Sequence, residues 1–439
     1  MTGARPATSG GIRRIMANLG LLLGGKVGAG AISLIYLMIA ARTLGARDYG
    51  VLVLIHAYVT LVGGIIAFSG FHGLVRYGSI ALEAGDHGRL LRLTRFMTLV
   101  ELGFGLAAII VAALAVPLVG PHLGWSPAAM QFALPYSLAV LATVRSTPQG
   151  LLQLAGRFDL IGVHNLVAPL VRVGGSVLVW WLGGGLIGFL AVWLVAAVAE
   201  GASMWAFGLW ALARMKLDQP LLGSARGAVA DNPQLVSFIA TTNLDLTLAE
   251  LARKLAPLAV GWVLGPRAAG IFALAQRASV VLEQPATLIG QASYPVMARQ
   301  LAEGDRAGFR QSVWHSAALA MLAAAPVVVL LGLFGRNLLD LIGGGSFEGG
   351  AKLLLLLALA RAVGIGAPSL SAGLIAMGRP QRSITVNLVS NLLLFPLLPA
   401  LLWWRGVDGA GWHALLIALI ATAALALYFR REAARAEVG

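Results

Sequence analysis

This chain has no cysteine and few charged residues. None of its 439 residues is cysteine, and only 11% are Asp, Glu, Lys or Arg. Without cysteine, a disulfide framework and a thiolate metal site are excluded. An ordinary soluble domain is excluded as well, because such domains have about 25% charged residues.

Metal and nucleotide patterns are also missing. The seven histidines include no H-x-x-x-H pair, the spacing that places two imidazoles on one helix face. Gly20 to Lys26 reads G-x-x-x-x-G-K, but Val27 stands where a phosphate-binding loop has a hydroxyl residue. We therefore expect no metal and no cofactor.

Apolar residues dominate instead. They form 59% of the chain, and the mean hydropathy is +0.84. A membrane-spanning helix needs roughly 20 apolar residues, and the long runs do not show the short alternation of a membrane barrel. We predict an all-α polytopic integral membrane protein with about 12 transmembrane helices. The expected spans are 15–40, 50–75, 96–118, 130–154, 162–182, 186–210, 235–264, 268–297, 313–334, 350–376, 384–404 and 410–429.

The second half of the chain repeats the first. The segment from Leu44-Gly45 to Gly50 returns as Leu264-Gly265 to Gly270, 220 residues later. Two repeated lobes that rock about a central site are typical of transporters. The other repeated residues recur 222 or 223 positions later: Ala155-Gly156-Arg157 with Met377-Gly378-Arg379, Asn165 with Asn387, Trp180-Trp181 with Trp403-Trp404, and Gly188 with Gly411.

An even number of helices in each repeat gives both halves the same orientation. We therefore predict two repeated six-helix lobes around a central cleft. The expected parts are a cytoplasmic N-terminal tail at 1–14, a lobe at 15–210, a cytoplasmic linker at 211–233, a second lobe at 234–429 and a cytoplasmic C-terminal tail at 430–439.

The net charge of +14 reflects membrane topology. With both termini in the cytoplasm, 19 of the 32 Lys and Arg residues fall on cytoplasmic segments and six on the opposite side. This asymmetry sets the orientation. It also argues against nucleic acid as a partner.

Twelve charged residues remain within the expected spans, where each costs about 2.5–3.5 kcal/mol unless it is paired or hydrated. Glu250 and Lys254 are four residues apart and can pair on one helix face. Glu101 is close enough to the cytoplasmic end for its carboxylate to reach the membrane surface. The bases are Lys26, Arg145, Arg172, Arg253, Lys254, Arg277 and Arg361; the acids are Glu101, Glu200, Asp245, Glu250 and Glu283.

Four of the bases lie near mid-span and have no acid three or four residues away on their own helix: Lys26, Arg145, Arg172 and Arg361. We expect them to be unpaired and to face a hydrated interior, with an internal ion pair as the alternative for each. Guanidinium groups bind phosphate oxygens through pairs of hydrogen bonds. These four, with Arg253 and Lys254, are therefore the candidate binding residues for a lipid or sugar that carries phosphate or pyrophosphate.

Asp245 and Glu250 are candidate ligands for a driving proton or Na⁺, because intramembrane acids often mark ion pathways. Asn243 adds a further oxygen beside Asp245. Helix capping or an internal ion pair is the alternative interpretation.

Several short segments, spread over nearly the whole chain, are similar to one family. With the repeat and the expected helix number, they make the chain resemble the Wzx-type polysaccharide flippases of the multidrug/oligosaccharidyl-lipid/polysaccharide exporter superfamily. The segments are Ala40 to Gly45 with Tyr49-Gly50, Gly73 to Tyr77, Val260 to Phe272, Tyr294-Pro295 and Met377 to Arg379.

The resemblance implies a V-shaped, two-lobed transporter in the bacterial inner membrane. Such a protein moves an undecaprenyl-pyrophosphate-linked oligosaccharide to the outer leaflet for O-antigen, capsule or exopolysaccharide synthesis. Its expected partners are membrane lipids, a polysaccharide polymerase and a chain-length regulator. One position departs from the family pattern: Ala256 stands where many members have an acidic residue. This difference weakens the transfer of their ion-binding site to this chain.

Two other functions compete. A drug or small-metabolite exporter of the same superfamily favours organic cations and needs an acidic interior, whereas the spans hold more bases than acids. A membrane-embedded polymerase, ligase or glycosyltransferase needs a catalytic outer loop or an acidic metal motif. The outward loops 119–129 and 335–349 have no paired carboxylates. We therefore expect a transporter and not an enzyme.

Overall fold

The computed structural model describes a molecule built from helices. It covers residues 9–215, 217, 220, 223–280, 297, 299–301 and 303–438, without the side chains of 9–27, 31, 245, 246, 249, 250 and 436–438. No residue in these ranges lies in a strand. The prediction of an all-α fold is confirmed.

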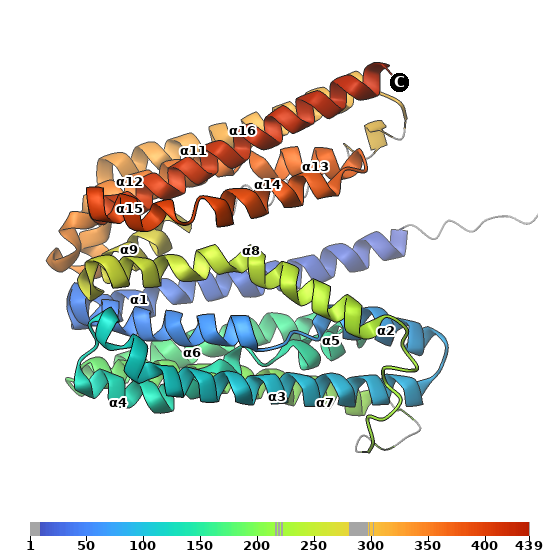
Figure 1. The fold of residues 1–439 in the computed structure, drawn as a ribbon, viewed down its shortest axis with the longest axis horizontal. Helices are drawn as coiled ribbons and strands as arrows, with labels where there is room; N and C mark the ends of the chain where they lie inside the picture. The colour runs from blue at the N-terminus through green and yellow to red at the C-terminus, as the bar shows by residue number, and fades with distance from the viewer. Residues whose placement is uncertain are drawn as a thin grey trace, which may run out of the picture. The chain divides into compact units, whose positions relative to one another are not determined.

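The α-helices (α) and 3₁₀ helices (η) follow one another with short connections (Figure 1). The first half contains α1 (Ser9–Ile66), α2 (Phe71–Glu83), α3 (His87–Val119), η1 (Pro121–Leu123), α4 (Pro127–Tyr136), η2 (Ser137–Ala142), α5 (Ser146–Leu154), α6 (Phe158–Trp181) and α7 (Leu186–Arg214). The second half contains α8 (Leu235–Leu264), α9 (Pro266–Ser279), α11 (Arg306–Gly343), η4 (Gly345–Gly350), α12 (Ala351–Gly364), α13 (Ala367–Ala376), α14 (Pro380–Leu393), α15 (Leu397–Arg405) and α16 (Asp408–Val438).

Eight helical segments among the described residues are long and apolar enough to cross a membrane. A ninth span follows if α14 and α15, which meet at a bend of 47°, count as one. The chain is thus a multi-pass membrane protein, whereas the count of twelve helices stays a prediction. Part of the difference between twelve expected spans and the number found lies in α1, which contains two helices joined at Gly45. Part lies in the expected span 268–297, most of whose second half is outside the described ranges.

The chain divides into two compact units. Unit 1 comprises Met1–Thr43, Ile55–Pro121 and Trp125–Thr247, and unit 2 comprises Leu44–Leu54, His122–Gly124 and Leu248–Gly439. The division falls inside α8, beyond the expected linker at 211–233.

The first half of α8 packs in unit 1. Its Ile239 lies in a buried cluster with Leu74 and Met97. The Asn243 side chain forms two hydrogen bonds with the backbone of Ser69: Oδ1 accepts from the Ser69 N–H at 2.7 Å, and Nδ2 donates to the Ser69 carbonyl at 2.9 Å. These contacts explain why unit 1 continues past the linker.

The end of the linker forms an ion pair and a hydrogen bond with α3. Arg92 Nε pairs with Asp231 Oδ2 at 2.7 Å. One turn earlier, Arg89 Nε donates to Oδ1 of the buried Asn232 at 3.0 Å. The described end of the linker therefore belongs to unit 1.

The internal repeat is visible in the backbone. Gly45 and Gly265 interrupt the helices with nearly equal dihedral angles, φ 69° and ψ 176° against φ 83° and ψ 177°. A positive φ is open to glycine and strained for residues with a Cβ. The repeated motif therefore sets the same break in each half.

A second pair of glycines ends two corresponding helices. Gly156 after α5 and Gly378 after α13 have φ values of 68° and 74°. The following arginines make the same bond: Arg157 N donates to Leu152 O at 2.8 Å, and Arg379 N donates to Leu374 O at 2.9 Å. Both ends show the Schellman pattern, so the repeat in sequence is a repeat in structure.

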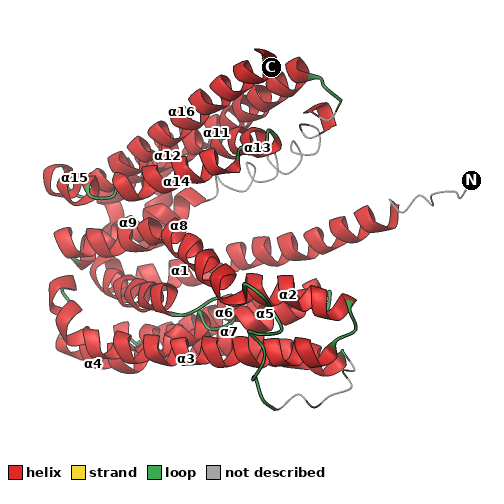
Figure 2. Ribbon diagram, turned by 45° about the vertical axis from the view of Figure 1, so that its right-hand side comes forward, coloured by secondary structure: helices red, strands yellow, loops and turns green. Residues whose placement is uncertain are grey.

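Long apolar helices form each unit. In unit 1, α6 packs on α7, and in unit 2, α12 packs on α16 and on α11 (Figure 2). Apolar side chains also cover outer faces: Leu114 and Leu118 on α3 are each 72% exposed, and Leu333 on α11 is 70% exposed. Continuous apolar faces of this kind are suited to contact with lipid.

The repeated glycines Gly50 and Gly270 meet within unit 2. A Cβ added to Gly50 would lie 1.8 Å from the Pro266 carbonyl oxygen, and one added to Gly270 would lie 2.2 Å from the Ala46 carbonyl oxygen. Helix backbones touch here without side chains between them, as small residues permit in membrane proteins.

We expect Gly50→Ala to lower the melting temperature of the purified protein in detergent by several degrees. The added methyl group meets backbone, which cannot rotate away, and overpacking of this kind costs about 1–3 kcal/mol. Gly174→Ala in α6 is the matched control, because a Cβ there meets nothing within 4 Å. Equal melting temperatures of the two variants would contradict the close contact.

Candidate functional site

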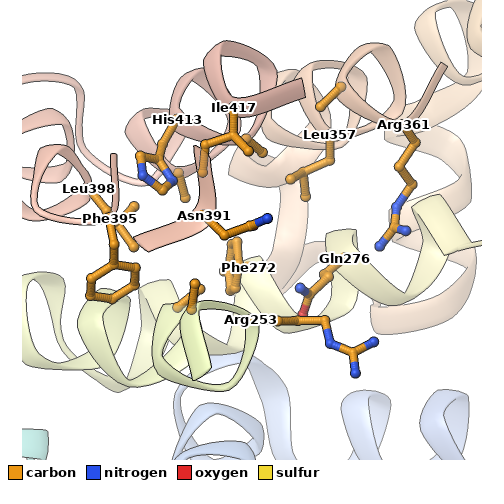
Figure 3. Close-up of a pocket in the computed structure, with 15 residues that line it drawn as sticks. Arg253, Phe272, Gln276, Leu357, Arg361, Asn391, Phe395, Leu398, His413 and Ile417 are labelled. Carbon is orange, nitrogen blue, oxygen red and sulfur yellow. The ribbon is translucent and has the colours of Figure 1, made fainter. Parts of the chain in front are cut away.

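Unit 2 contains a cavity of about 360 Å³ (Figure 3). Side chains from α8, α9, α12, α14, α15 and α16 line it, together with Phe395 from the break between α14 and α15. No acidic side chain is among the described residues of its wall. Small-molecule sites have about 300–1,000 Å³ and combine apolar walls with a few polar groups, so this cavity has the size and character of a binding site. Its polar side chains are Arg253, Gln276, Arg361, Asn391 and His413.

Arg361 on α12 is held in place by its neighbours. Its Nε donates to Ser279 Oγ at 2.7 Å, and this hydroxyl, on a fully buried residue, donates to the Gln276 carbonyl at 2.8 Å. The guanidinium group is thereby oriented before any ligand arrives, as a binding site requires.

Arg253 on α8 faces the same end of the cavity as Arg361 (Figure 3). Both guanidinium groups carry a positive charge. Like charges near each other in a medium of low dielectric repel strongly. An anion bound between them would remove this repulsion and accept hydrogen bonds from both groups.

The other end of the cavity is polar but uncharged. His413 Nε2 is 2.9 Å from the Leu394 carbonyl oxygen, next to the break between α14 and α15. Because a carbonyl oxygen can only accept, Nε2 carries the proton, and Nδ1 of the neutral ring is the acceptor. Asn391 Nδ2 donates to the Asn387 carbonyl at 2.7 Å. The helix break thus holds His413 in place, whereas Asn391 is held by a carbonyl within α14.

One of the two mid-span arginines in unit 1 pairs with an acid. Arg145, just before α5, forms an ion pair with Glu200 on α7. The same guanidinium nitrogen lies 3.1 Å from His164 Nε2, and His164 Nδ1 lies 3.1 Å from Ser203 Oγ. The expectation of an unpaired charge at Arg145 is wrong, because its acid comes from another helix, 55 residues away in sequence.

Arg172 on α6 is held by aromatic rings. Its guanidinium carbon lies 5.6 Å from the Tyr36 ring centroid and 5.4 Å from that of Trp193, and NH1 donates to the Tyr36 hydroxyl at 3.3 Å. Cation–π contacts are strongest where water is excluded. Arg172 Nε is buried and has no hydrogen-bond partner among the residues that the structure describes.

Glu101 does not reach the membrane surface. It is fully buried on α3, and its two carboxylate oxygens accept from the backbone N–H groups of Ser146 and Thr147, the latter at 2.8 Å. These are the first residues of α5, where helical N–H groups have no partner within the helix. The expectation of a snorkelling carboxylate is therefore wrong, and Glu101 caps an internal helix break.

The other residues predicted from the sequence are not part of the described wall of the cavity. Lys254 on α8 is not among the residues that line the cavity. The side chains of Lys26, Asp245 and Glu250 lie outside the described part of the chain. Within that part, no group of three or more His, Asp or Glu residues is arranged to hold a metal ion.

Three cavity residues were missed from the sequence: Gln276, Asn391 and His413. Each is a polar side chain inside an expected apolar span, and this is the signal that would have found them. Ala256, the position that departs from relatives, also lines the cavity.

Sequence comparison places the chain among polysaccharide biosynthesis proteins. The family model with that description matches residues 39–350. The inner membrane protein YghQ of Escherichia coli (strain K12) is 26% identical over 290 residues, which are 66% of this chain and 82% of that protein.

Two solved transporter structures have the same fold as this chain. An inward-facing multidrug resistance MATE family transporter of the MOP superfamily aligns with a TM-score of 0.71 at 14% identity, over 93% of this chain and 94% of that one. The lipid II flippase MurJ, in an inward closed conformation, aligns with a TM-score of 0.69 at 12% identity, over 92% and 86%. At these identities the likeness concerns the fold, which is that of MOP-superfamily transporters.

We expect Arg145→Gln and Glu200→Gln each to lower the melting temperature. The decrease in the double variant should be smaller than the sum of the two single decreases, because each single variant leaves one unpaired charge inside the protein and the double variant leaves no unpaired charge. A double-mutant cycle on unfolding in detergent should give a coupling free energy of about 0.5–3 kcal/mol. Strictly additive losses would contradict the ion pair.

Proposed function

Since the chain belongs to the polysaccharide biosynthesis protein family, we propose that it is a flippase for a lipid-linked oligosaccharide. Its cargo is a glycan on undecaprenyl pyrophosphate, moved from the cytoplasmic to the outer leaflet of the bacterial inner membrane. The family match and the MOP-superfamily fold, shared with the lipid II flippase MurJ, support this proposal.

One observation carries the choice of cargo: two guanidinium groups, of Arg253 and Arg361, face a cavity whose described wall has no carboxylate. Such a site favours an anion and disfavours a cation. Pyrophosphate has several oxygens that accept pairs of charge-assisted hydrogen bonds from arginine. In this mechanism Arg253 and Arg361 bind the pyrophosphate, while the polyprenyl chain stays in the surrounding lipid.

Other parts of the machinery are proposed from the sequence. Alternating access follows from the duplicated architecture. Asp245 and Glu250 are proposed to bind the driving ion, and Lys26, Arg172 and Lys254 to add positive charge along the cargo's path. Arg145 joins them when its pair with Glu200 opens. We also propose cytoplasmic termini, and a polymerase and chain-length regulator as partners.

A drug or small-metabolite exporter is the second candidate. The fold favours it as much as a flippase, because MATE transporters share the fold. The charge of the cavity separates the two functions: an organic cation would meet Arg253 and Arg361 without a compensating carboxylate among the described wall residues.

The proposal is tested with proteoliposomes that contain a lipid-linked oligosaccharide accessible to a sugar-cleaving enzyme from one side only. We expect the purified protein to move the lipid from the protected leaflet to the other leaflet, where the enzyme can cleave its sugar. Arg253→Gln and Arg361→Gln should each slow this by about 10-fold or more, because a charge-assisted hydrogen bond contributes about 1.5–3 kcal/mol.

Arg336→Gln is the matched control, because Arg336 is exposed, pairs with Glu348 at 3.4 Å and is not part of the cavity wall. Its flipping rate should equal that of the unchanged protein. Full activity in both cavity variants, or export of cationic dyes without flipping, would contradict the proposal.

A further inference from the structure

A pair of exposed tryptophans stands at the end of a membrane span in each copy of the repeat. Trp180 and Trp181 are the last two residues of α6, and Trp403 and Trp404 are followed by a single residue of α15. Both helices belong to the apolar spans described above. The four side chains are between 62% and 86% exposed, and none of them lines the cavity of unit 2. They are therefore free to contact something outside the chain.

The two helix ends share one local structure. Gly183 and Gly406, which are also 223 residues apart, follow the tryptophan pairs with φ values of 66° and 61°. Glycine adopts this positive φ without strain and so ends each helix at the same place. One residue separates each pair from its glycine: Leu182 in unit 1 and Arg405 in unit 2. The two copies therefore differ at the position where unit 2 gains a positive charge.

The side chains around both pairs are apolar. Leu178 and Leu182 beside the first pair are exposed, as are Leu393 and Leu397 beside the second. A helix face that lines a water-filled passage would be polar, whereas exposed leucines suit contact with lipid. Tryptophan at the end of a lipid-facing helix favours the headgroup level of the bilayer, because its ring is apolar and its N–H is polar.

The length of α7, which follows the first tryptophan pair, agrees with this level. Its 29 residues give a helix of about 43 Å, and a bilayer with its headgroups is about 40–45 Å thick. Trp210 lies near the other end of α7, and the guanidinium carbons of Arg157 and Arg214 are 4.6 Å and 5.1 Å from its ring centroid. Tryptophans thus mark both ends of a helix that reaches from one headgroup layer to the other.

Arg405 adds a cation to the tryptophan pair of unit 2. Its guanidinium carbon lies 4.2 Å from the centroid of the Trp404 ring, so the ring holds the charge in place. Asp408, the acid that follows it in sequence, pairs with Lys352 at 3.1 Å. The N–H groups of Arg405 can therefore bind an external anion, and guanidinium groups match the oxygens of a phosphate.

We propose that Trp403, Trp404 and Arg405 bind the headgroup of a phospholipid. The lipid phosphate accepts hydrogen bonds from Arg405, and the two indole rings lie against the glycerol and the first carbons of the acyl chains. In unit 1, Leu182 replaces the cation, so that pair holds lipid through its rings alone. This inference does not depend on the cargo. With the proposed orientation of the chain, the bound phospholipid belongs to the outer leaflet.

The level of the rings is measured by the fluorescence of the full chain in phosphatidylcholine vesicles. The lipid carries bromine either near the headgroup or near the ends of the acyl chains. The emission of the pair is the difference between the unchanged protein and Trp403→Phe/Trp404→Phe, in which aromatic rings remain and indole emission is lost. We expect bromine near the headgroup to quench this emission about 2-fold more strongly.

The phosphate contact is tested by the affinity of the protein in detergent for short-chain phosphatidylglycerol. We expect Arg405→Gln to weaken the binding of the first lipid about 3-fold, a small factor because an exposed charge is partly screened. Leu182→Arg should strengthen binding by a similar factor, because it gives unit 1 the cation of unit 2. Arg336→Gln is the control and should change nothing, because this exposed arginine is already paired with Glu348.

Each result decides for or against the lipid site. Equal affinities of Arg405→Gln, Leu182→Arg and the unchanged protein would overturn the phosphate contact. Stronger quenching from the chain ends, or none from either lipid, would overturn the headgroup level. Quenching by a soluble sugar such as maltotriose would assign the rings to a glycan and overturn the proposal. None of these results bears on cargo binding at Arg253 and Arg361, so the flippase proposal is tested separately.

Discussion

Charge inside an apolar surrounding is the constraint on which this structure depends. A guanidinium group within the membrane must find an acid, an aromatic ring or a polar ligand. In unit 1, Arg145 pairs with Glu200, and Arg172 lies over Tyr36 and Trp193. In unit 2, Arg361 donates a hydrogen bond to Ser279, and Arg361 and Arg253 both line a cavity. The two copies of the duplicated architecture therefore surround their arginines differently.

The helix breaks make these arrangements possible. Before α5 the break is capped by Glu101 and presents Arg145, and between α14 and α15 the break offers the Leu394 carbonyl to His413. An uninterrupted helix would use these backbone groups within its own ladder. Irregular backbone at membrane depth is tolerated where it lines a cavity or is buried in protein, and both breaks meet this condition.

The sequence predicted the helices and the repeat because both depend on local pattern. Long apolar runs indicate membrane helices, and glycines at positive φ keep their place in both copies, as Gly45 and Gly265 show. Two of the residues singled out from the sequence, Arg253 and Arg361, line one cavity, and their role in binding stays a prediction. The pairing of Arg145 with Glu200 and the capping role of Glu101 were missed, because each joins helices far apart in sequence. The neutral polar residues Gln276, Asn391 and His413 were missed because an uncharged side chain is much less unusual in an apolar span than a charged one.

We propose that Arg253 and Arg361 together hold the pyrophosphate of the cargo. The most direct test is an experimental structure of the protein with undecaprenyl pyrophosphate bound. We expect pyrophosphate oxygens within hydrogen-bonding distance of both guanidinium groups, in the cavity of unit 2. A headgroup bound elsewhere, with that cavity holding only lipid tails or water, would contradict it.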